Sequence, residues 1–530
     1  MRTDKRLIIL AGLALVACLV GGCSVMASQT TDGVWLAGDF HTHTRLTDGD
    51  HLQEMIVSNA VDRYGLEFLA NSEPGGASSS DPNGVLWDDP ARESTPTLLG
   101  DAAYQYDESG VAQRAMWRWQ SLRDYSWPLL FGGTDGDGVT WSGLQHTYRA
   151  VLIQGLEWNV PGHAQASVGL IGQPDGEALS AFEYRFDAQD HDTSRSAELT
   201  KQNATHADAV AALAHLQEQF SSSSYVLLNQ PSRSLAYDAA SIRDLHNAAP
   251  DVLLGIEGLP GHQKAAQRGG YDAVFSIGEG SSQIDEERTA QARTYGGADI
   301  ALARVGGLMD SLWGEGRHIW VVASSAFCNT HEDFWPGEYA KTYIQAPAMT
   351  AQGVLNGLRS GNVFVVHGDL ITELEFDVAT SSGKAGMGST LQVAVGEDVT
   401  VTIRFRGPAL DYTGYRPVVD HIDLIVGEVT GLQNPGEPGY AAATNPSAHV
   451  LATFTEQDWS ASRGYTQISY TLHDVQHALY LRLRGTNLGL NVPNETLDGN
   501  PLSDDLIPND AAAARADLWF YSNPIFISVR

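Results

Sequence analysis

The sequence is poor in cysteine. Among its 530 residues only Cys18, Cys23 and Cys328 occur, and so few cysteines cannot build a disulfide framework. Buried hydrophobic cores must therefore stabilise the fold. The chain is long enough for two or more domains, because a single core rarely extends over more than about 250 residues.

Positive charge is also scarce. Lys and Arg together number 32, against 64 Asp and Glu, so the formal net charge is −32. Nucleic-acid binding needs clustered positive charge, and we therefore expect no nucleic-acid partner. The same imbalance argues against direct contact of the folded part with anionic lipid and is typical of a highly soluble surface.

Several familiar catalytic motifs are missing. The sequence has no nucleotide-binding phosphate loop, no Gly-x-Ser-x-Gly elbow and no Cys-x-x-Cys pair. Each of these motifs places a phosphate-binding backbone, a nucleophilic serine or a redox thiol pair in a defined geometry. Any enzymatic activity must therefore depend on another group of residues.

The apolar run near the start of the chain is short. It covers residues 7–20, follows a basic segment and precedes Gly21, Gly22 and Cys23. A membrane-spanning helix needs about 20 apolar residues, so this pattern predicts an export signal. Residues 20–23 resemble a bacterial lipobox, which would make Cys23 the lipidated first residue; the alternative is an ordinary secretory signal with an incidental cysteine.

This interpretation implies a location and a domain boundary. We expect residues 1–23 to be a lipoprotein signal peptide and the small, polar residues 24–33 to be a tether. Ser24, in place of an aspartate, favours sorting to the outer membrane, with the protein facing the periplasm. The lipid anchor would be the only membrane contact, and Cys328 the only free thiol of the mature chain.

Residues 34–371 alternate between short apolar strands and helical patterns. Such alternation predicts an α/β fold with a parallel sheet covered on both faces, and seven strands suit a closed (β/α) barrel. Two long insertions, 75–147 and 261–316, are expected to form lids or to contain their own helices. The helical pattern is strongest at 206–220, and the expected strands are 34–40, 66–70, 150–156, 225–228, 252–256, 319–323 and 363–366.

From residue 372 onward the hydrophobic period changes to two. Leu374, Phe376 and Val378 alternate with polar residues, and the same pattern returns around 399–405 and 479–483. Clusters of Gly, Pro and Asn separate these segments. Residues 372–530 are therefore predicted to form an antiparallel β-sandwich domain.

Polar residues gather where the expected strands of the first domain end. Chemistry in α/β barrels collects at the carboxyl ends of the strands, where the following loops converge. Imidazole and carboxylate side chains together suit Zn, Mn or Fe. The candidate metal ligands are His41, His43, Asp48, Glu157 and His163, with Glu73 and Cys328 as further candidates.

The segment HTHTRLTDG, residues 41–49, resembles the first motif of the PHP (polymerase and histidinol phosphatase) superfamily. GLEFLANSEPGG, VLIQGLEWNVPGHAQ, LLNQPSR and VVASSAFC fall where further motifs of that family should lie, and DFWPGEY and DLWFYSNPIFI are similar to an exported two-domain branch. The resemblance implies a distorted seven-stranded barrel. It also implies hydrolysis of phosphoesters or related esters with up to three metal ions.

Four positions depart from the family pattern. Pro74, Gln230, Ala326 and Cys328 stand where the family usually has metal ligands. By the family scheme His41, His43 and Glu157 would hold one ion, and Glu157 with His163 a second. The third ion would have only Asp48 and Cys328, because proline has no ligating atom; Cys328 could be either a zinc ligand or an inert buried thiol.

Two functional hypotheses follow. The first is an exported, metal-dependent hydrolase of a small phosphoester or related ester, with one or two ions and metal-bound hydroxide as the nucleophile. Arg233 would clamp the substrate, although a structural ion pair is an equal alternative. The second is a catalytically inactive PHP-like lipoprotein that acts as a binding or scaffold module. The sequence does not indicate the oligomeric state.

Overall fold

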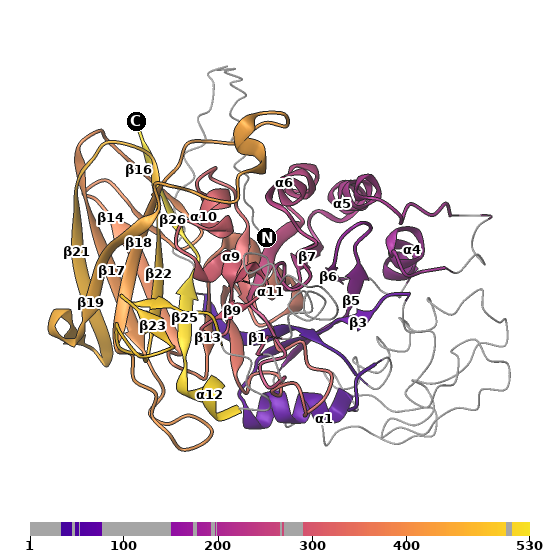
Figure 1. The fold of residues 1–530 in the computed structure, drawn as a ribbon, viewed down its shortest axis with the longest axis horizontal. Coiled ribbons are helices and arrows are strands. Elements are labelled where there is room, and N and C mark those ends of the chain that lie inside the picture. Colours follow the sequence, from indigo (N-terminus) through magenta and orange to yellow (C-terminus); the bar gives the residue numbers. More distant parts are fainter. Residues whose placement is uncertain are drawn as a thin grey trace, which may run out of the picture. The chain divides into compact units, whose positions relative to one another are not determined.

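The fold is mixed α/β, and its strands belong mainly to three sheets (Figure 1). The computed structural model describes residues 33–44, 48–51, 53–76, 150–172, 177–191, 197, 199–265, 268–269, 290–504 and 511–530. The expected signal peptide, nearly all of the tether and almost the whole insertion 75–147 lie outside these ranges. Within them, no helix is long and apolar enough to cross a membrane.

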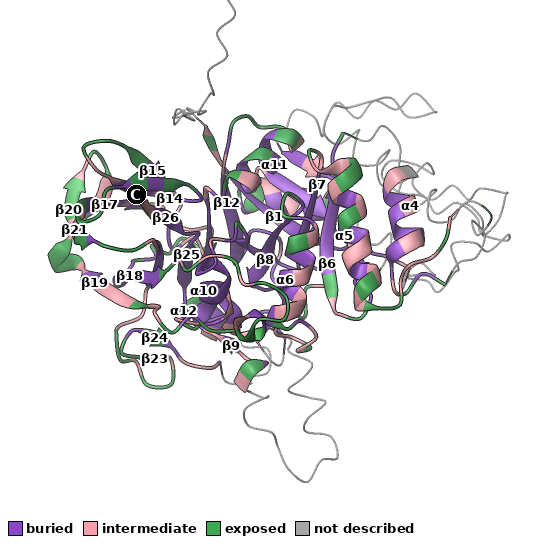
Figure 2. Ribbon diagram, turned by 90° about the horizontal axis from the view of Figure 1, so that it is seen from above, coloured by how far each residue is buried: buried purple, intermediate pink, exposed green. Residues whose placement is uncertain are grey.

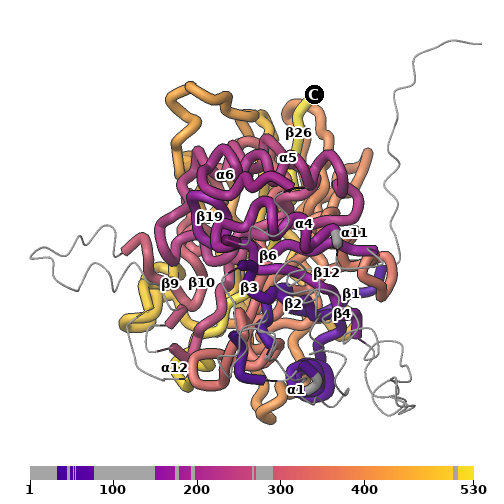
Figure 3. Tube along the Cα trace, turned by 90° about the vertical axis from the view of Figure 1, so that its right-hand side faces the viewer, coloured from indigo at the N-terminus to yellow at the C-terminus, as the bar shows by residue number. Residues whose placement is uncertain are grey.

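One sheet has six strands in the order β11-β8-β7-β6-β5-β3. Its strands β7, β8 and β11 are parallel, whereas β6 runs antiparallel to both of its neighbours. Helices α4, α5 and α6 lie along one side of these strands (Figure 3). The bounds are β3 Glu73–Pro74, β5 Gly155–Asn159, β6 Gln165–Leu170, α4 Glu177–Phe186, α5 His206–Phe220, β7 Ser224–Leu228, α6 Ala239–Ala248, β8 Leu253–Leu259 and β11 Trp320–Ala323.

The largest sheet has eleven strands and joins the N-terminal and C-terminal parts of the chain. Its main path is β16-β26-β22-β25-β13-β12-β1-β2-β4, and β18 and β19 extend it from β22. The strands are β1 Val34–Thr42, β2 Phe68–Asn71, β4 Val151–Ile153, β12 Ala340–Ala346, β13 Val363–His367, β16 Thr390–Val393, β18 His421–Glu428, β19 His449–Thr455, β22 Leu479–Thr486, β25 Trp519–Ser522 and β26 Ile525–Val529.

These two sheets meet at three places. Only Ser72 separates β2 from β3, and only Gln154 separates β4 from β5. At the other end, Thr42 of β1 forms a parallel bridge with Phe327, four residues beyond the end of β11. The strand ends that carry the candidate ligands therefore lie around one region.

The pairing differs from the wholly parallel sheet that the sequence predicted. Strand β12 was not predicted; it lies between β1 and β13 and is antiparallel to both. Strand β13 also pairs antiparallel with β25, which is near the C-terminus. The expected parallel pairing was therefore wrong for β13, and β6 was not predicted either. Apolar composition identifies a buried strand without giving its direction.

The period-two segments form antiparallel strands, as expected. In β14 the alternating residues Leu374, Phe376 and Val378 are buried. A five-stranded antiparallel sheet has the order β15-β14-β17-β21-β20. Its strands are β14 Glu373–Ala379, β15 Lys384–Gly386, β17 Glu397–Arg406, β20 Ser460–Ser462 and β21 Tyr465–Val475.

Shorter elements complete the described chain. A helical segment after β1 continues as one π-helical turn, and Gly65, with φ +73°, ends it. The described part of the insertion 261–316 contains two short helices, one of the two alternatives that the sequence left open. The remaining bounds are α1 Gln53–Ser58, π turn Asn59–Arg63, β9 Thr294–Tyr295, β10 Ala298–Asp299, α9 Ile300–Ala303, α10 Leu308–Trp313, α11 Ala351–Ser360, η4 Pro438–Ala441, η5 Glu456–Asp458, β23 Thr496–Leu497, β24 Asn500–Pro501 and α12 Ala511–Ala516.

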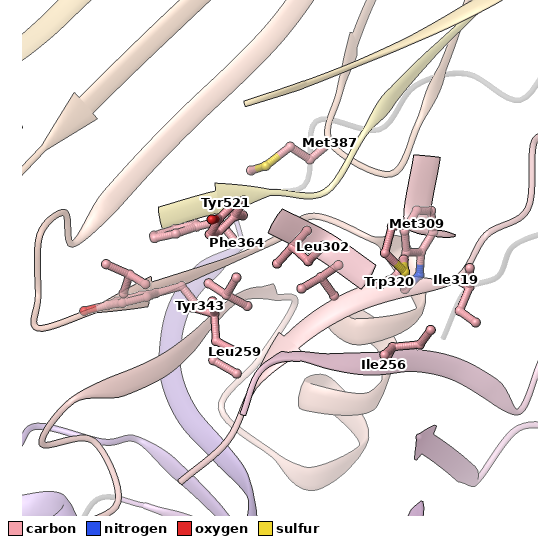
Figure 4. Close-up of a cluster of buried hydrophobic side chains, with 14 of the residues drawn as sticks. Ile256, Leu259, Leu302, Met309, Ile319, Trp320, Tyr343, Phe364, Met387 and Tyr521 are labelled. Atoms are coloured by element: carbon pink, nitrogen blue, oxygen red, sulfur yellow. The ribbon is translucent and has the colours of Figure 1, made fainter. Parts of the chain in front are cut away.

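The hydrophobic core includes residues from both expected domains, 34–371 and 372–530. Residues Asp32–Arg530 form a single compact unit, and the strands at its centre are buried whereas the outer faces of α5 and α11 are exposed (Figure 2). One hydrophobic cluster includes Ile256 of β8, Phe364 of β13 and Tyr521 of β25 (Figure 4). Strands from both ends of the chain therefore exclude water together.

Asn523 makes a specific polar link across this core. Its side-chain oxygen accepts a hydrogen bond from the Val321 N–H at 2.8 Å, and its amide nitrogen donates to the Val363 carbonyl at 3.1 Å. The residue is 1% exposed. It therefore ties the end of β25 to both β11 and β13.

We expect Asn523→Ala to lower the free energy of unfolding by about 1–3 kcal/mol, because it leaves a buried backbone N–H without a partner. Denaturant unfolding followed by circular dichroism measures this change. The control is Asn434→Ala at an exposed loop position, which should change stability by less than about 0.5 kcal/mol. Equal effects of the two substitutions would contradict this role of Asn523.

Candidate metal centre

The end of strand β1 brings two histidines to one pocket: His41 is in β1, and His43 follows its last residue, Thr42. His41 and His43 are separated by one residue, and side chains two apart on a strand point to the same face. The backbone here is fixed on two sides: the His43 N–H donates to the Phe327 carbonyl at 2.9 Å, and the His41 N–H donates to Asp39 at 2.9 Å. Asp39 also accepts the Ser325 N–H, which connects β1 to the segment after β11.

Three potential ligand atoms converge at this point. His41 Nε2 lies 2.9 Å from His43 Nε2 and 3.2 Å from Glu157 Oε1, and His43 Nε2 lies 3.8 Å from Glu157 Oε2. Both histidines are almost fully buried. Glu157 comes from β5, so segments distant in sequence supply the group.

A carboxylate faces the outer nitrogen of each imidazole. His41 Nδ1 lies 2.8 Å from Glu257 Oε1, and His43 Nδ1 lies 2.9 Å from Asp48 Oδ1. An ionised carboxylate only accepts hydrogen bonds, so each Nδ1 carries the hydrogen and, in a neutral ring, each Nε2 carries a lone pair. Outer carboxylates of this kind commonly orient metal-binding histidines.

Two lone pairs facing each other at 2.9 Å, beside a carboxylate, require a positive charge between them. A proton or a metal ion can supply it. Burial lowers the pKa of His41, but the charges of Glu257 and Glu157 outweigh it and raise the pKa to about 9. Burial raises the pKa of Glu157, and the two histidines reverse this and lower it to about 2. The group therefore holds a cationic centre strongly.

A second set of ligand types shares His43. His43, Asp48 and Cys328 each offer one ligand atom within 4.8 Å of the others. Burial raises the pKa of the Cys328 thiol to about 11, although His43 opposes this shift. The thiol is therefore protonated near neutral pH and is a weak ligand unless a cation displaces its proton.

Two predicted ligands lie outside both groups. Glu73 is fully buried, and its carboxylate accepts the Thr44 N–H at 3.0 Å. His163 places Nδ1 2.8 Å from the Ala236 carbonyl oxygen and Nε2 2.8 Å from His206 Nδ1. The structure therefore brings together His41, His43, Glu157, Asp48 and Cys328, but not Glu73 or His163.

The convergent atoms open into a pocket of about 250 Å³. Arg233 lies in its wall and donates to the Gln230 side-chain oxygen at 3.1 Å. This contact occupies the amide oxygen of Gln230. The lining consists of His41, His43, Asp48, Glu157, Ala164, Gln165, Asn229, Gln230, Arg233, Ser234, His262 and Cys328.

Two features of the pocket do not follow from the sequence motifs. Asn229 donates from its amide nitrogen to Glu157 Oε1 at 3.1 Å and so orients that carboxylate. His262 also lines the pocket, with Nδ1 2.7 Å from Oδ1 of buried Asp333. No local motif identifies Asp333 as its partner, because 71 residues separate them.

The backbone beyond three neighbouring strands adopts an unusual conformation. Gln230, His262 and Ala326 have φ values of +40°, +57° and +46°. These residues follow β7, β8 and β11 respectively, and non-glycine residues rarely adopt such angles. Backbone strain of this kind clusters at functional sites, in agreement with a pocket built from these loops.

With a chelator present, we expect stability to decrease as the pH rises from 7 to 9. The folded pKa of His41, about 9, exceeds its ordinary value of 6.5, so its stabilisation is complete below pH 6.5 and is lost as the pH passes 9. The loss is at most of order 3 kcal/mol, since a tenfold change in proton affinity is worth about 1.4 kcal/mol.

Urea unfolding at several pH values tests this expectation. His41→Gln should remove most of the decrease; the pKa of His43 is raised in the same direction, so a smaller slope should remain. An unchanged stability of the chelated wild-type protein between pH 7 and 9 would contradict the proposed charge balance.

No protein-family model matches the sequence, and no curated protein matches it. One similar solved structure is described as a two-domain protein containing a predicted PHP-like metal-dependent phosphoesterase from Bacteroides vulgatus ATCC 8482. It is 10% identical, the match covers 89% of this chain and 94% of that chain, and the TM-score is 0.32.

Proposed function

We propose that the protein is a metal-dependent hydrolase of a small phosphoester or related ester, with one divalent ion at the pocket. The observation that carries this proposal is the convergence of His41 Nε2, His43 Nε2 and Glu157 with a carboxylate behind each imidazole. Two imidazoles, one carboxylate and an open position form a common catalytic zinc arrangement; Mn and Fe accept the same ligand types.

A bound divalent ion would supply Lewis acidity at this point, polarising an ester oxygen and lowering the pKa of water. The chain's own residues would do the rest. Glu257 and Asp48 hold the hydrogens on the outer imidazole nitrogens, and Asn229 holds Glu157 in place. In this arrangement Glu257, Asp48 and Asn229 would orient the three ligands.

Other residues in the pocket suit an anionic substrate. Arg233 is the cationic residue in the lining, and a guanidinium binds phosphate or carboxylate oxygens in a fixed geometry. Asp333 keeps the hydrogen on His262 Nδ1, so Nε2 is the nitrogen that would exchange a proton with a leaving group. The small volume of the pocket favours a small-molecule substrate.

The strand arrangement supports the PHP-type barrel that the motifs suggest. Counting β2 with β3 and β4 with β5 as interrupted strands, seven strands follow one another in the ring β1, β2/β3, β4/β5, β6, β7, β8 and β11. The Thr42–Phe327 bridge would close this ring. We propose that the ring is a distorted barrel continuous with the C-terminal strands.

A non-catalytic binding module is the second candidate. Its support is the chemistry at two family ligand positions: Ala326 offers only a buried methyl group, and Gln230 is engaged by Arg233. The position of Pro74 likewise offers no ligand atom, so a three-ion site does not fit these residues. In this alternative the remaining ion would be structural.

Metal analysis of the purified protein, combined with a screen of phosphoesters and carboxyl esters, separates these candidates. We expect about one equivalent of transition metal at the pocket, and His41→Ala should remove both this metal and the activity. Glu257→Gln should weaken metal binding by about 10–100-fold, because outer partners tune affinity by this amount. His473→Ala, at an exposed position in β21, is the matched control.

Absence of bound metal after growth with an adequate supply would exclude the hydrolase. Bound metal without turnover of any ester would favour the binding module. Activity that survives His41→Ala would place the chemistry elsewhere.

We also propose that the protein is a lipoprotein anchored through Cys23 to the bacterial envelope, with the folded part in the periplasm. The support is the basic, apolar and small-residue pattern of residues 1–23. Cys23→Ser should release the protein from the membrane fraction into the soluble envelope fraction, measured by fractionation and immunoblotting. A mutant that stays membrane-bound would show that lipidation of Cys23 is not the anchor.

A further inference from the structure

A second pair of facing imidazoles lies outside the pocket. His163 is in the turn between β5 and β6, and His206 is the first residue of α5. Their nitrogens, Nε2 of His163 and Nδ1 of His206, are 2.8 Å apart. Neither residue belongs to the pocket lining or to the group around Glu157.

The partners of the other two nitrogens favour one tautomer of each ring. His163 Nδ1 faces the Ala236 carbonyl oxygen at 2.8 Å, and His206 Nε2 faces Asp244 Oδ2 at 3.3 Å. Both partners are acceptors, so both of these nitrogens carry hydrogen. In neutral rings the two facing nitrogens therefore each present a lone pair, and the contact is repulsive unless a cation lies between them.

Both rings are held in place by their surroundings. His163 stacks on Tyr237 with ring centroids 5.1 Å apart and planes inclined by 7°. Thr205 and Asp208 cap the start of α5 reciprocally and fix His206, and the Tyr440 hydroxyl donates to Asp244 at 2.6 Å. The pair is therefore pre-organised, which reduces the entropy lost when it binds an ion.

The distance between the facing nitrogens is that of a chelating pair. Two metal–nitrogen bonds of about 2.0 Å place their nitrogens about 2.8 Å apart at the 90° angle of square-planar and octahedral sites, and about 3.3 Å apart at the tetrahedral angle. The observed 2.8 Å matches the first geometry, and tetrahedral Zn²⁺ needs the two nitrogens to separate by about 0.5 Å.

We propose that His163 and His206 bind a divalent transition-metal ion that prefers imidazole nitrogen, such as Zn²⁺, Ni²⁺ or Cu²⁺. Among the described residues, no third His, Cys, Asp or Glu joins the pair within 4.8 Å, so water or a small ligand would fill the other positions. An ion with two protein ligands is more exchangeable than a closed structural site. The proposal is independent of the hydrolase proposal, since the two sites share no ligand.

Equilibrium dialysis of the untagged full-length protein against Zn²⁺, with quantification of the bound metal, tests both sites. We expect two equivalents in the wild type, one in His206→Ala, one in His41→Ala and none in the double variant. His163→Gln should reproduce the loss seen in His206→Ala. His215→Ala, which changes a half-buried histidine on the same helix, is the control and should bind as the wild type does.

The bound-metal counts distinguish the His163–His206 site from the hydrolase site. If His206→Ala and His163→Gln each retain all bound metal while circular dichroism shows them folded, the second site does not exist. If His206→Ala loses the only equivalent and His41→Ala loses none, the second site stands and the hydrolase site fails. If the wild type binds no Zn²⁺, both are overturned.

Discussion

The candidate metal centre depends on the hydrogen bond between His41 and Glu257. Glu257 is fully buried on β8, and its second oxygen, Oε2, has no hydrogen-bond partner among the described residues. Burying a carboxylate in this way is costly unless a positive charge lies nearby. The imidazole of His41, which contacts both Glu257 and Glu157, is the group that can offset this cost. Stability of the sheet and affinity for a cation are therefore linked through one side chain.

The sequence indicates which residues converge more readily than which residues orient them. His41, His43 and Glu157 were recognisable as candidates because a spaced motif and strand-end positions put them at one edge of a sheet. Glu257 could not be identified as the partner of His41, since 216 residues separate them and the contact depends on the register of β8. The His163–His206 contact was not predicted, because a hairpin turn and a helix start must pack together before it exists.

The fold, too, was predictable only in part. Helix α5 was predicted with the bounds that the structure has, because its hydrophobic period and its capping residues agree. Strand direction could not be predicted, and the insertion of β12 between β1 and β13 reversed the expected parallel order. A short apolar run has the same composition whether its strand is parallel or antiparallel to its neighbours, so composition does not give the strand direction.

The C-terminal strands make buried polar contacts with the part of the chain before residue 372. Arg482 of β22 makes two hydrogen bonds with Asp310 of α10, at 2.8 and 2.7 Å, and both residues are fully buried. Such a pair is of uncertain net value for stability, but removal of either partner leaves a buried charge. It therefore favours one arrangement of α10 against β22.

Strand β25 lies between β13 and β22, although it follows β13 in the chain only after the whole of β14 to β24. Until residues 519–522 pair with it, β13 is an open sheet edge, even when β1 and both histidines are already in place. Exposed strand edges are prone to pair with other chains, so correct assembly of the large sheet depends on a contact between segments far apart in the sequence, and such contacts form slowly.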